Sequence, residues 1–237
     1  MRDVAWACAR PALRLRLAFF RHAVRTGTYP PVSPPRPRDP AADRVAYVGN
    51  AAAARFGVLE EELTTLSRVA SAVASARGRP FRWEEGATPV LTVRQALSEP
   101  TQAFAAVDAV VVALGYSDVL LMTSTRAWGR DLDSLLDLMR RPGEVLSPVL
   151  VAAVPPMHEL RQTSRGARSR IRTQIVRLNA ESARVVSERG DCVFVPFPDP
   201  EAANARVAGQ LWSWARVHQI WADSLVPELV RVLDEAA

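Results

Sequence analysis

Residues 107–114 (VDAVVVAL) decide the fold class of this chain. The run has the length of a strand, is rich in valine, and ends directly before Gly115. Apart from Asp108 it is continuously apolar. Strands that are buried on both faces, as in a parallel sheet covered by helices on either side, have this composition. The run therefore predicts a buried strand of a parallel sheet.

On both sides of this strand, short apolar runs alternate with segments of helical periodicity. We expect further strands at residues 44–48, 81–83, 149–154 and 192–197. Helices are expected where apolar residues recur three or four positions apart, at residues 59–73, 128–139, 171–185 and 208–235, with Pro227 starting a separate final helix. The alternation predicts a three-layer α/β/α sandwich, flavodoxin-like, around a parallel sheet of about five strands.

The first 43 residues differ from the rest of the chain in charge and composition. They contain eight arginines and three aspartates, which account for the whole net charge of +5, whereas residues 44–237 are neutral overall. Residues 1–26 have the pattern of an arginine-rich amphipathic helix, and residues 27–43 hold six prolines, which favour an extended linker. We therefore expect one folded domain at residues 44–237, preceded by a helix and a linker.

Composition and charge also argue against several classes of protein. A neutral folded body argues against a nucleic-acid binder, and no run of eighteen apolar residues is present to span a membrane. Cys8 and Cys192 are too far apart in sequence to indicate a disulfide framework or a zinc site, so we expect no metal and no cofactor. A cytoplasmic protein is the simplest expectation. The basic residues 1–26 leave two alternatives open, peripheral contact with an anionic membrane or docking on the domain.

The candidate site is expected where strands end, because open α/β sheets bind ligands beyond the carboxyl ends of their strands. Three such ends stand out, at residues 48–51 (VGNA), 115–118 (GYSD) and 155–158 (PPMH). In a parallel sheet these loops meet at one edge. The sequence therefore predicts a site there.

The order of these segments resembles that of the SGNH (GDSL-type) hydrolase family. Residues 45–58 (VAYVGNAAAARFGV) resemble its first block, in which a strand ends in Gly-Asp-Ser. Residues 86–88 (GAT) resemble the glycine turn of the second block. Residues 108–118 (DAVVVALGYSD) resemble the third block, a strand leading to Gly-x-Asn-Asp. The resemblance continues through residues 123–128 (TSTRAW) and the Pro-Pro turn to the C-terminal segment 213–233.

The resemblance implies hydrolysis or transfer of acyl groups from esters, thioesters or sugars. In this family a serine attacks the acyl carbon, and a histidine in a C-terminal Asp-x-x-His motif accepts the serine proton. The backbone N–H of that serine, a glycine and an asparagine bind the oxyanion.

This chain departs from the family pattern at most of the reactive positions. Ala51 stands where the nucleophilic serine is expected, after Asn50 in place of aspartate, and Ser117 replaces the oxyanion asparagine. The Asp-x-x-His motif falls near residues 209 and 212, which are glycine and tryptophan. The glycines of the second and third blocks, Gly86 and Gly115, are retained, as is Asp118.

We therefore expect a pseudoenzyme, retained for binding a small acyl or sugar ligand or a protein partner. The alternative is an active esterase or acyltransferase with a relocated nucleophile, in which His158 or His218 pairs with Ser117, Ser124 or Asp118. Each of these residues also has a structural explanation: His218 as a packed helix residue, His158 as a loop residue and Asp118 as a helix cap. A tryptophan near the C-terminal motif, Trp212, is a candidate to plug the former mouth of the site.

Overall fold

Five parallel strands form one sheet in the order β2-β1-β3-β4-β5. The computed structural model describes residues 39–49, 54–85, 92–98, 107–139, 147–159, 165–198 and 213–236, together with residues 11, 15, 18, 19, 22 and 26. The strands are β1 (Asp43–Gly49), β2 (Phe81–Glu85), β3 (Ala109–Ala113), β4 (Val149–Ala152) and β5 (Cys192–Val195). The valine-rich run is thus the central strand, as its double-sided apolar composition predicts.

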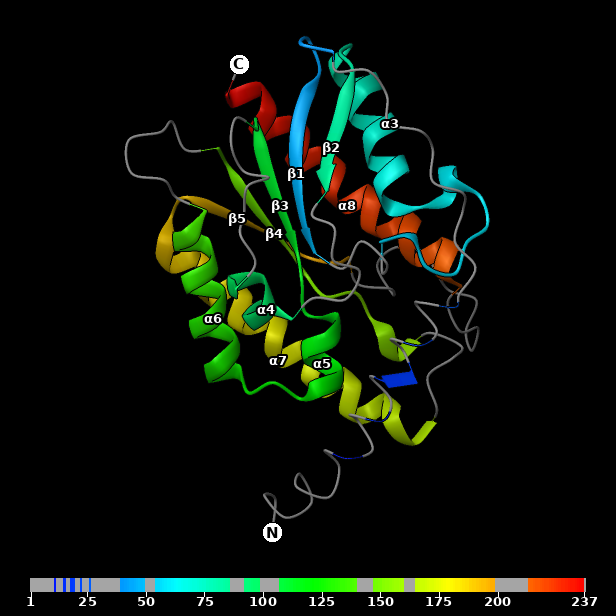
Figure 1. Cartoon of the computed structure of the whole chain (residues 1–237), viewed down its shortest axis with the longest axis vertical. Coiled ribbons are helices and arrows are strands. Elements are labelled where there is room, and N and C mark those ends of the chain that lie inside the picture. The colour runs from blue at the N-terminus through cyan, green and yellow to red at the C-terminus, as the bar shows by residue number, and fades with distance from the viewer. Residues whose placement is uncertain are drawn as a thin grey trace.

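Helices cover both faces of the sheet (Figure 1). One face carries α3 (Thr65–Arg77) and α8 (Trp214–Glu235), which pack against each other. The other face carries α4 (Val93–Ser98), α6 (Thr125–Leu138) and α7 (Arg165–Arg189). Three short helices complete the described part, η1 (Glu61–Leu63), α5 (Tyr116–Leu121) and η3 (Met157–Glu159). The expected three-layer α/β/α sandwich with five parallel strands is confirmed.

Alternate strand residues divide the core into two layers, because successive side chains of a strand point to opposite faces. In β1 and β3, Val45 and Val111 face α3 and α8, whereas Ala46 and Val110 face the α4, α6 and α7 side. All four side chains are buried. Burial on both faces is the reason that β3 is continuously apolar.

The last helix corrects one expectation. We expected Pro227 to begin a separate helix, but it lies inside α8, which is continuous from Trp214 to Glu235. Proline removes one intrahelical hydrogen bond, at a cost of about 3 kcal/mol. The face of α8 that is buried against α3 and the sheet extends across this point, with Leu225 before the proline and Leu229 and Leu233 after it. Burial of these three side chains stabilises the helix on both sides of the proline.

Of residues 1–26, the structure describes Pro11, Leu15, Ala18, Phe19, His22 and Thr26, which are helical and exposed. Of the predicted linker, residues 27–43, the structure describes residues 39–43: residues 39–42 form a turn, and Asp43 already begins β1. Residues 27–38 lie outside the described residues. None of the helices in the described ranges has the length and apolarity needed to cross a membrane.

Candidate functional site

The carboxyl ends of β1, β3 and β4 form the edge of the sheet at which the sequence predicts a site. Several of the predicted positions lie outside the described residues: Asn50, Ala51, Gly86, Gly209 and Trp212. The glycine that ends β1, Gly49, is described. A Cβ atom at this position would lie 2.4 Å from the carbonyl oxygen of Ala113 in β3. Close packing of β1 on β3 therefore requires glycine here, whether or not the neighbouring residues are reactive.

Gly115 forms the turn between β3 and α5. Its φ angle of +109° lies in the left-handed region that favours glycine. A Cβ atom would also lie 2.3 Å from Cγ2 of Val154, which follows β4. The glycine thus lets the loops after β3 and β4 approach each other, and this structural requirement accounts for its retention.

Asp118 joins two helices at this edge. Its Oδ2 accepts a hydrogen bond from the backbone N–H of Val93 at the start of α4, at 3.1 Å, and its Oδ1 accepts one from Thr123 Oγ1, at 3.0 Å. Burial raises the pKa of the carboxyl to about 6, although both hydrogen bonds act in the opposite direction. Asp118, which lies in α5, therefore caps the start of α4, the helix that precedes β3 in the chain. It does not cap the helix that follows β3.

Ser117, which the family resemblance aligns with the oxyanion asparagine, is fully buried. Its hydroxyl has no hydrogen-bond partner among the described residues. Ser124, a second hydroxyl considered for a relocated nucleophile, is the N-cap of α6 and accepts a hydrogen bond from the N–H of Ala127 at 3.2 Å. Neither hydroxyl contacts a histidine in the part of the chain that the structure describes.

His158 lies in η3, beyond the Pro-Pro turn after β4. Its Nε2 is 3.2 Å from Glu159 Oε1, and its Nδ1 is buried without a partner among the described residues. Burial lowers the pKa of the imidazole, and the positive charges of Arg172 and Arg168 lower it further, against the opposing effect of Glu159. The structure therefore does not pair His158 with Ser117, Ser124 or Asp118.

His218 makes a contact that the sequence does not predict. Its Nδ1 lies 2.8 Å from Oγ1 of Thr65, at the start of α3, and its Nε2 lies 3.0 Å from the carbonyl oxygen of Phe56. The side chain is 0% exposed, and burial lowers its pKa to about 4. The imidazole is therefore neutral at physiological pH, and both of its nitrogens are engaged inside the α3–α8 layer.

An aromatic cluster fills the space between the segment after β1 and the helix after β3. Trp214, the first residue of α8, stacks on Tyr116 with ring centroids 6.1 Å apart and meets Phe56 edge-on at 5.1 Å. It also lies 6.0 Å from the ring of His218. A Cβ atom on Gly57 would lie 2.2 Å from the indole ring. The indole is therefore enclosed at the edge of the sheet where ligands bind in open α/β folds.

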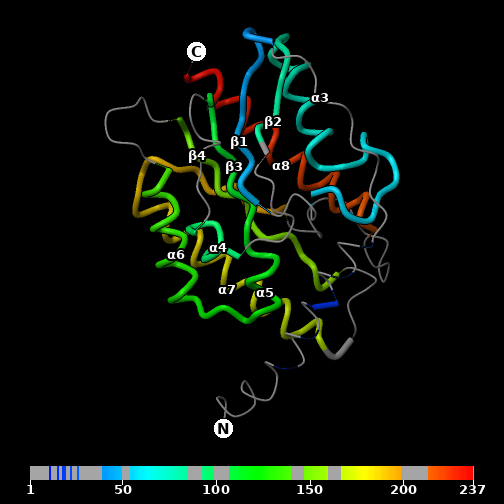
Figure 2. The backbone as a smooth tube through the Cα atoms, viewed as in Figure 1, coloured from blue at the N-terminus to red at the C-terminus, as the bar shows by residue number. Residues whose placement is uncertain are grey.

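The residues that meet around His218 were not predicted as a group. Thr65, Phe56 and Trp214 come from three separate segments, and the backbone trace in Figure 2 brings α3 and the start of α8 side by side. The one sequence signal was the aromatic character of the C-terminal segment, which suggested Trp212 as a plug. That residue lies outside the described residues, so its position is not tested, whereas Trp214, two positions along the chain, is buried.

No group of three or more histidine, cysteine, aspartate or glutamate side chains is placed to hold a metal ion within the described ranges. The groups described at this edge are instead a buried carboxyl, buried hydroxyls, a buried neutral imidazole and aromatic rings.

Comparison with solved structures identifies the architecture. No protein-family model and no curated protein matches the sequence. A carbohydrate acetylesterase family member from Sinorhizobium meliloti aligns with a TM-score of 0.58 and 18% identity, over 81% of this chain and 99% of that chain. TesA aligns with a TM-score of 0.57 and 15% identity, over 80% and 99%. The psychrotrophic esterase EstA from Pseudoalteromonas sp. aligns with a TM-score of 0.56 and 12% identity, over 81% and 99%.

This chain has the SGNH-hydrolase fold. The fold predicted from the order of the sequence blocks is therefore confirmed, and it extends over nearly the full length of these three proteins. At such low identity the similarity is one of fold, and fold alone does not assign chemistry. The chemistry of this SGNH-fold chain has to be argued from its own side chains.

Proposed function

We propose that this chain is an SGNH hydrolase relative that has lost ester hydrolysis and is retained for binding a ligand or a protein partner. The observation that carries the proposal is the enclosure of Trp214 between Phe56 and Tyr116, with His218 beside it. These residues follow β1 and β3 or begin α8, the segments that carry reactive groups in the family the sequence resembles. The hydroxyl that the packed rings bring to the cluster is the phenol of Tyr116, whose pKa is raised by burial, so the rings supply no activated serine.

The sequence supports the same proposal independently. Ala51 has a methyl group where relatives carry the attacking oxygen, and the Asp-x-x-His positions are Gly209 and Trp212. Removing one member of such a triad lowers the rate by roughly 10⁴- to 10⁶-fold. With nucleophile and base both missing, only oxyanion donors and binding remain, and the asparagine among those donors is replaced by Ser117.

A fluorophosphonate probe tests the proposal, because it labels activated serines irreversibly. We expect no labelling of the purified chain under conditions in which an active serine esterase is fully labelled. Heat-denatured protein serves as the control for nonspecific reaction. Labelling of the native chain that disappears on denaturation would overturn the proposal.

One observation favours the alternative of a relocated nucleophile. Thr65 and His218 form a hydroxyl–imidazole pair at 2.8 Å, and the carbonyl of Phe56 orients the ring. This is the arrangement of an activated nucleophile, its base and an orienting group. Burial argues against it, because Thr65 is 1% and His218 0% exposed, so an ester cannot reach the hydroxyl.

The two functions are separated by mapping any labelled residue. An active Thr65 would be modified by the probe in the wild-type chain and unmodified in Thr65→Val and in His218→Gln. If the chain is a pseudoenzyme, the wild-type chain and both variants should show the same background labelling.

A further inference from the structure

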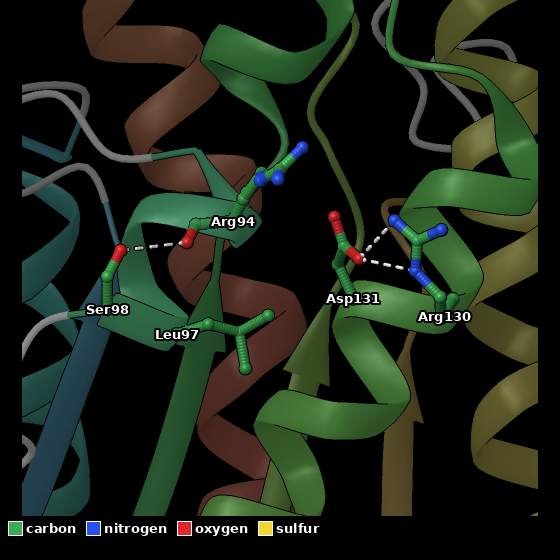
Figure 3. Close-up of a pocket in the computed structure, with 5 residues that line it drawn as sticks. All are labelled: Arg94, Leu97, Ser98, Arg130 and Asp131. Carbon is green, nitrogen blue, oxygen red and sulfur yellow. Dashed lines mark hydrogen bonds and ion pairs between the residues drawn. The ribbon is translucent and has the colours of Figure 1, made fainter.

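A hollow opens between α4 and α6, on the side of the sheet opposite α3 and α8 (Figure 3). Its volume is about 600 Å³, and it is lined by Arg94, Leu97, Ser98, Arg130 and Asp131. Small-molecule sites have volumes of roughly 300–1,000 Å³. None of these five residues belongs to the aromatic cluster of Trp214. The hollow lies on the α4 side of the site, where Arg94 follows Val93, the residue whose N–H binds Asp118.

Charged groups define the walls of the hollow. The Asp131 carboxylate is 10% exposed, and its Oδ1 accepts two hydrogen bonds from Arg130, from Nε at 2.9 Å and from Nη2 at 2.7 Å. In Figure 3 the second oxygen of Asp131 points away from Arg130, into the open space. Arg94 extends from α4 toward the same space and has no ion pair within the described ranges. Two guanidinium groups and one carboxylate give the hollow a net charge of +1.

The remaining walls add one apolar and one polar surface. Leu97 presents an aliphatic side chain between Ser98 and Asp131 (Figure 3). The Ser98 hydroxyl donates to the backbone carbonyls of Arg94 and Gln95, at 3.2 and 3.1 Å, which leaves only its lone pairs available to a ligand. The hollow therefore offers guanidinium donors, an acceptor carboxylate and an aliphatic contact.

We propose that this hollow binds a small organic carboxylate that carries a hydroxyl or ammonium group near its carboxylate. Arg94 and the free edge of Arg130 bind the carboxylate, because a guanidinium matches its geometry with two parallel hydrogen bonds. The second oxygen of Asp131 accepts a hydrogen bond from the ligand's donor, and Leu97 packs on its carbon chain. A phosphate dianion fits less well, because Asp131 repels its second charge.

Isothermal titration calorimetry of the full chain with 3-hydroxybutyrate, butyrate and inorganic phosphate tests this site. We expect 3-hydroxybutyrate to bind more tightly than butyrate, which lacks the donor, and more tightly than phosphate. Arg94→Gln should weaken the binding of 3-hydroxybutyrate by about tenfold, since one charge-assisted pair is lost. Asp131→Asn should remove most of the preference for 3-hydroxybutyrate over butyrate.

Arg126→Gln is the matched control. Arg126 lies on α6 one turn before Arg130, is exposed and does not line the hollow, so its removal changes the net charge equally. We expect it to change the affinity by less than about twofold.

The proposal would be overturned if 3-hydroxybutyrate did not bind the wild-type chain, or if phosphate bound more tightly than 3-hydroxybutyrate. It would also be overturned if Arg94→Gln and Arg126→Gln lost the same affinity for 3-hydroxybutyrate. Arg94 is exposed, so its variant is expected to fold, and its thermal unfolding curve verifies this. The outcome does not depend on whether the chain hydrolyses esters, because calorimetry measures ligand binding, whereas the fluorophosphonate experiment measures the reactivity of a nucleophile.

Discussion

The Nδ1 atom of His218 and the hydroxyl of Thr65 lie 2.8 Å apart and join α8 to α3 inside the core. A carbonyl oxygen can only accept a hydrogen bond, so the Nε2 atom that faces the Phe56 carbonyl carries the ring proton. Nδ1 is then the acceptor, and the Thr65 hydroxyl donates to it. The pair therefore holds three segments together: the one after β1, the start of α3 and the start of α8.

Replacing Thr65 with valine keeps the side-chain shape but leaves Nδ1 of His218 buried without a donor. An unsatisfied buried polar atom costs about 1–3 kcal/mol, so we expect Thr65→Val to lower the free energy of unfolding by that amount. Thr173→Val is the matched control, because Thr173 is exposed on α7, and its effect should stay below about 0.5 kcal/mol. Urea unfolding measures both. Equal effects of the two variants would show that the buried contact contributes nothing.

Asp118 and His218 should affect stability in opposite directions between about pH 4 and 6. The native carboxyl of Asp118 takes up its proton near pH 6 and the unfolded one near 3.8, so acidification through this window stabilises the native state. The imidazole of His218 takes up its proton near pH 4 in the native state and near pH 6.5 in the unfolded state, so the same acidification destabilises the native state. Each contribution is about 3 kcal/mol at most, and together they nearly cancel.

Two variants separate these contributions. Asp118→Asn should lose stability more steeply than the wild-type chain as the pH falls from 6 to 4, because the stabilising protonation is absent. His218→Gln should lose it less steeply, because the destabilising protonation is absent. Denaturant unfolding at several pH values measures the slopes, and parallel slopes in all three proteins would contradict the assignment.

Restoring a serine at residue 51 should not restore catalysis. We expect Ala51→Ser to leave hydrolysis of a p-nitrophenyl ester at the background of the wild-type chain, because glycine and tryptophan stand where the family resemblance places the Asp-x-x-His motif and His218 is engaged on both nitrogens. Ala52→Ser, one residue along, controls for a nonspecific effect of an added hydroxyl. Hydrolysis by Ala51→Ser but not by Ala52→Ser would show that a proton acceptor is available.

Gly115 should be intolerant of a side chain for two separable reasons. In Gly115→Ala the methyl group meets Val154 Cγ2 and the backbone keeps a φ of +109°, so we expect a loss of roughly 2–4 kcal/mol. Gly78→Ala is the control for the backbone part, because Gly78 has a φ of +62° and nothing within 4 Å of the added carbon. Val154→Ala removes the clashing methyl, so the double variant should lose less than the two single changes combined. Additive losses in thermal unfolding would contradict this account.

Peripheral membrane contact through residues 1–26 remains a proposal, and two exposed apolar side chains make it testable. Leu15 is 58% and Phe19 64% exposed, and the segment carries an excess of arginine. We expect the full chain to co-sediment with phosphatidylserine vesicles but not with phosphatidylcholine vesicles. The double variant Leu15→Gln, Phe19→Gln should reduce the fraction that co-sediments with phosphatidylserine vesicles. Leu59→Gln is the control, because Leu59 is 69% exposed outside the segment. Unchanged binding after deletion of residues 1–26 would rule out the contact.

The layer architecture could be predicted because it depends on local patterns. Continuous apolar runs such as β3 and the 3.6-residue periodicity of α6 follow from burial of each element by itself, and both are present in the sequence. The exception, Pro227, shows the limit of local rules. A proline usually starts or ends a helix, but burial of Leu225, Leu229 and Leu233 against the sheet overrides that preference.

The sequence by itself determined the α/β/α fold and which residues stand at the positions that the family resemblance makes reactive, because both are matters of pattern and order along the chain. Only the tertiary structure decided what surrounds them. Thr65 and His218 are 153 positions apart in sequence. Trp214 meets Phe56 and Tyr116 from a different part of the chain, at the start of α8, which packs on α3. Hydrogen bonds and ring contacts act over a few ångströms, so such partners are chosen by folding and carry no periodic signal in the sequence.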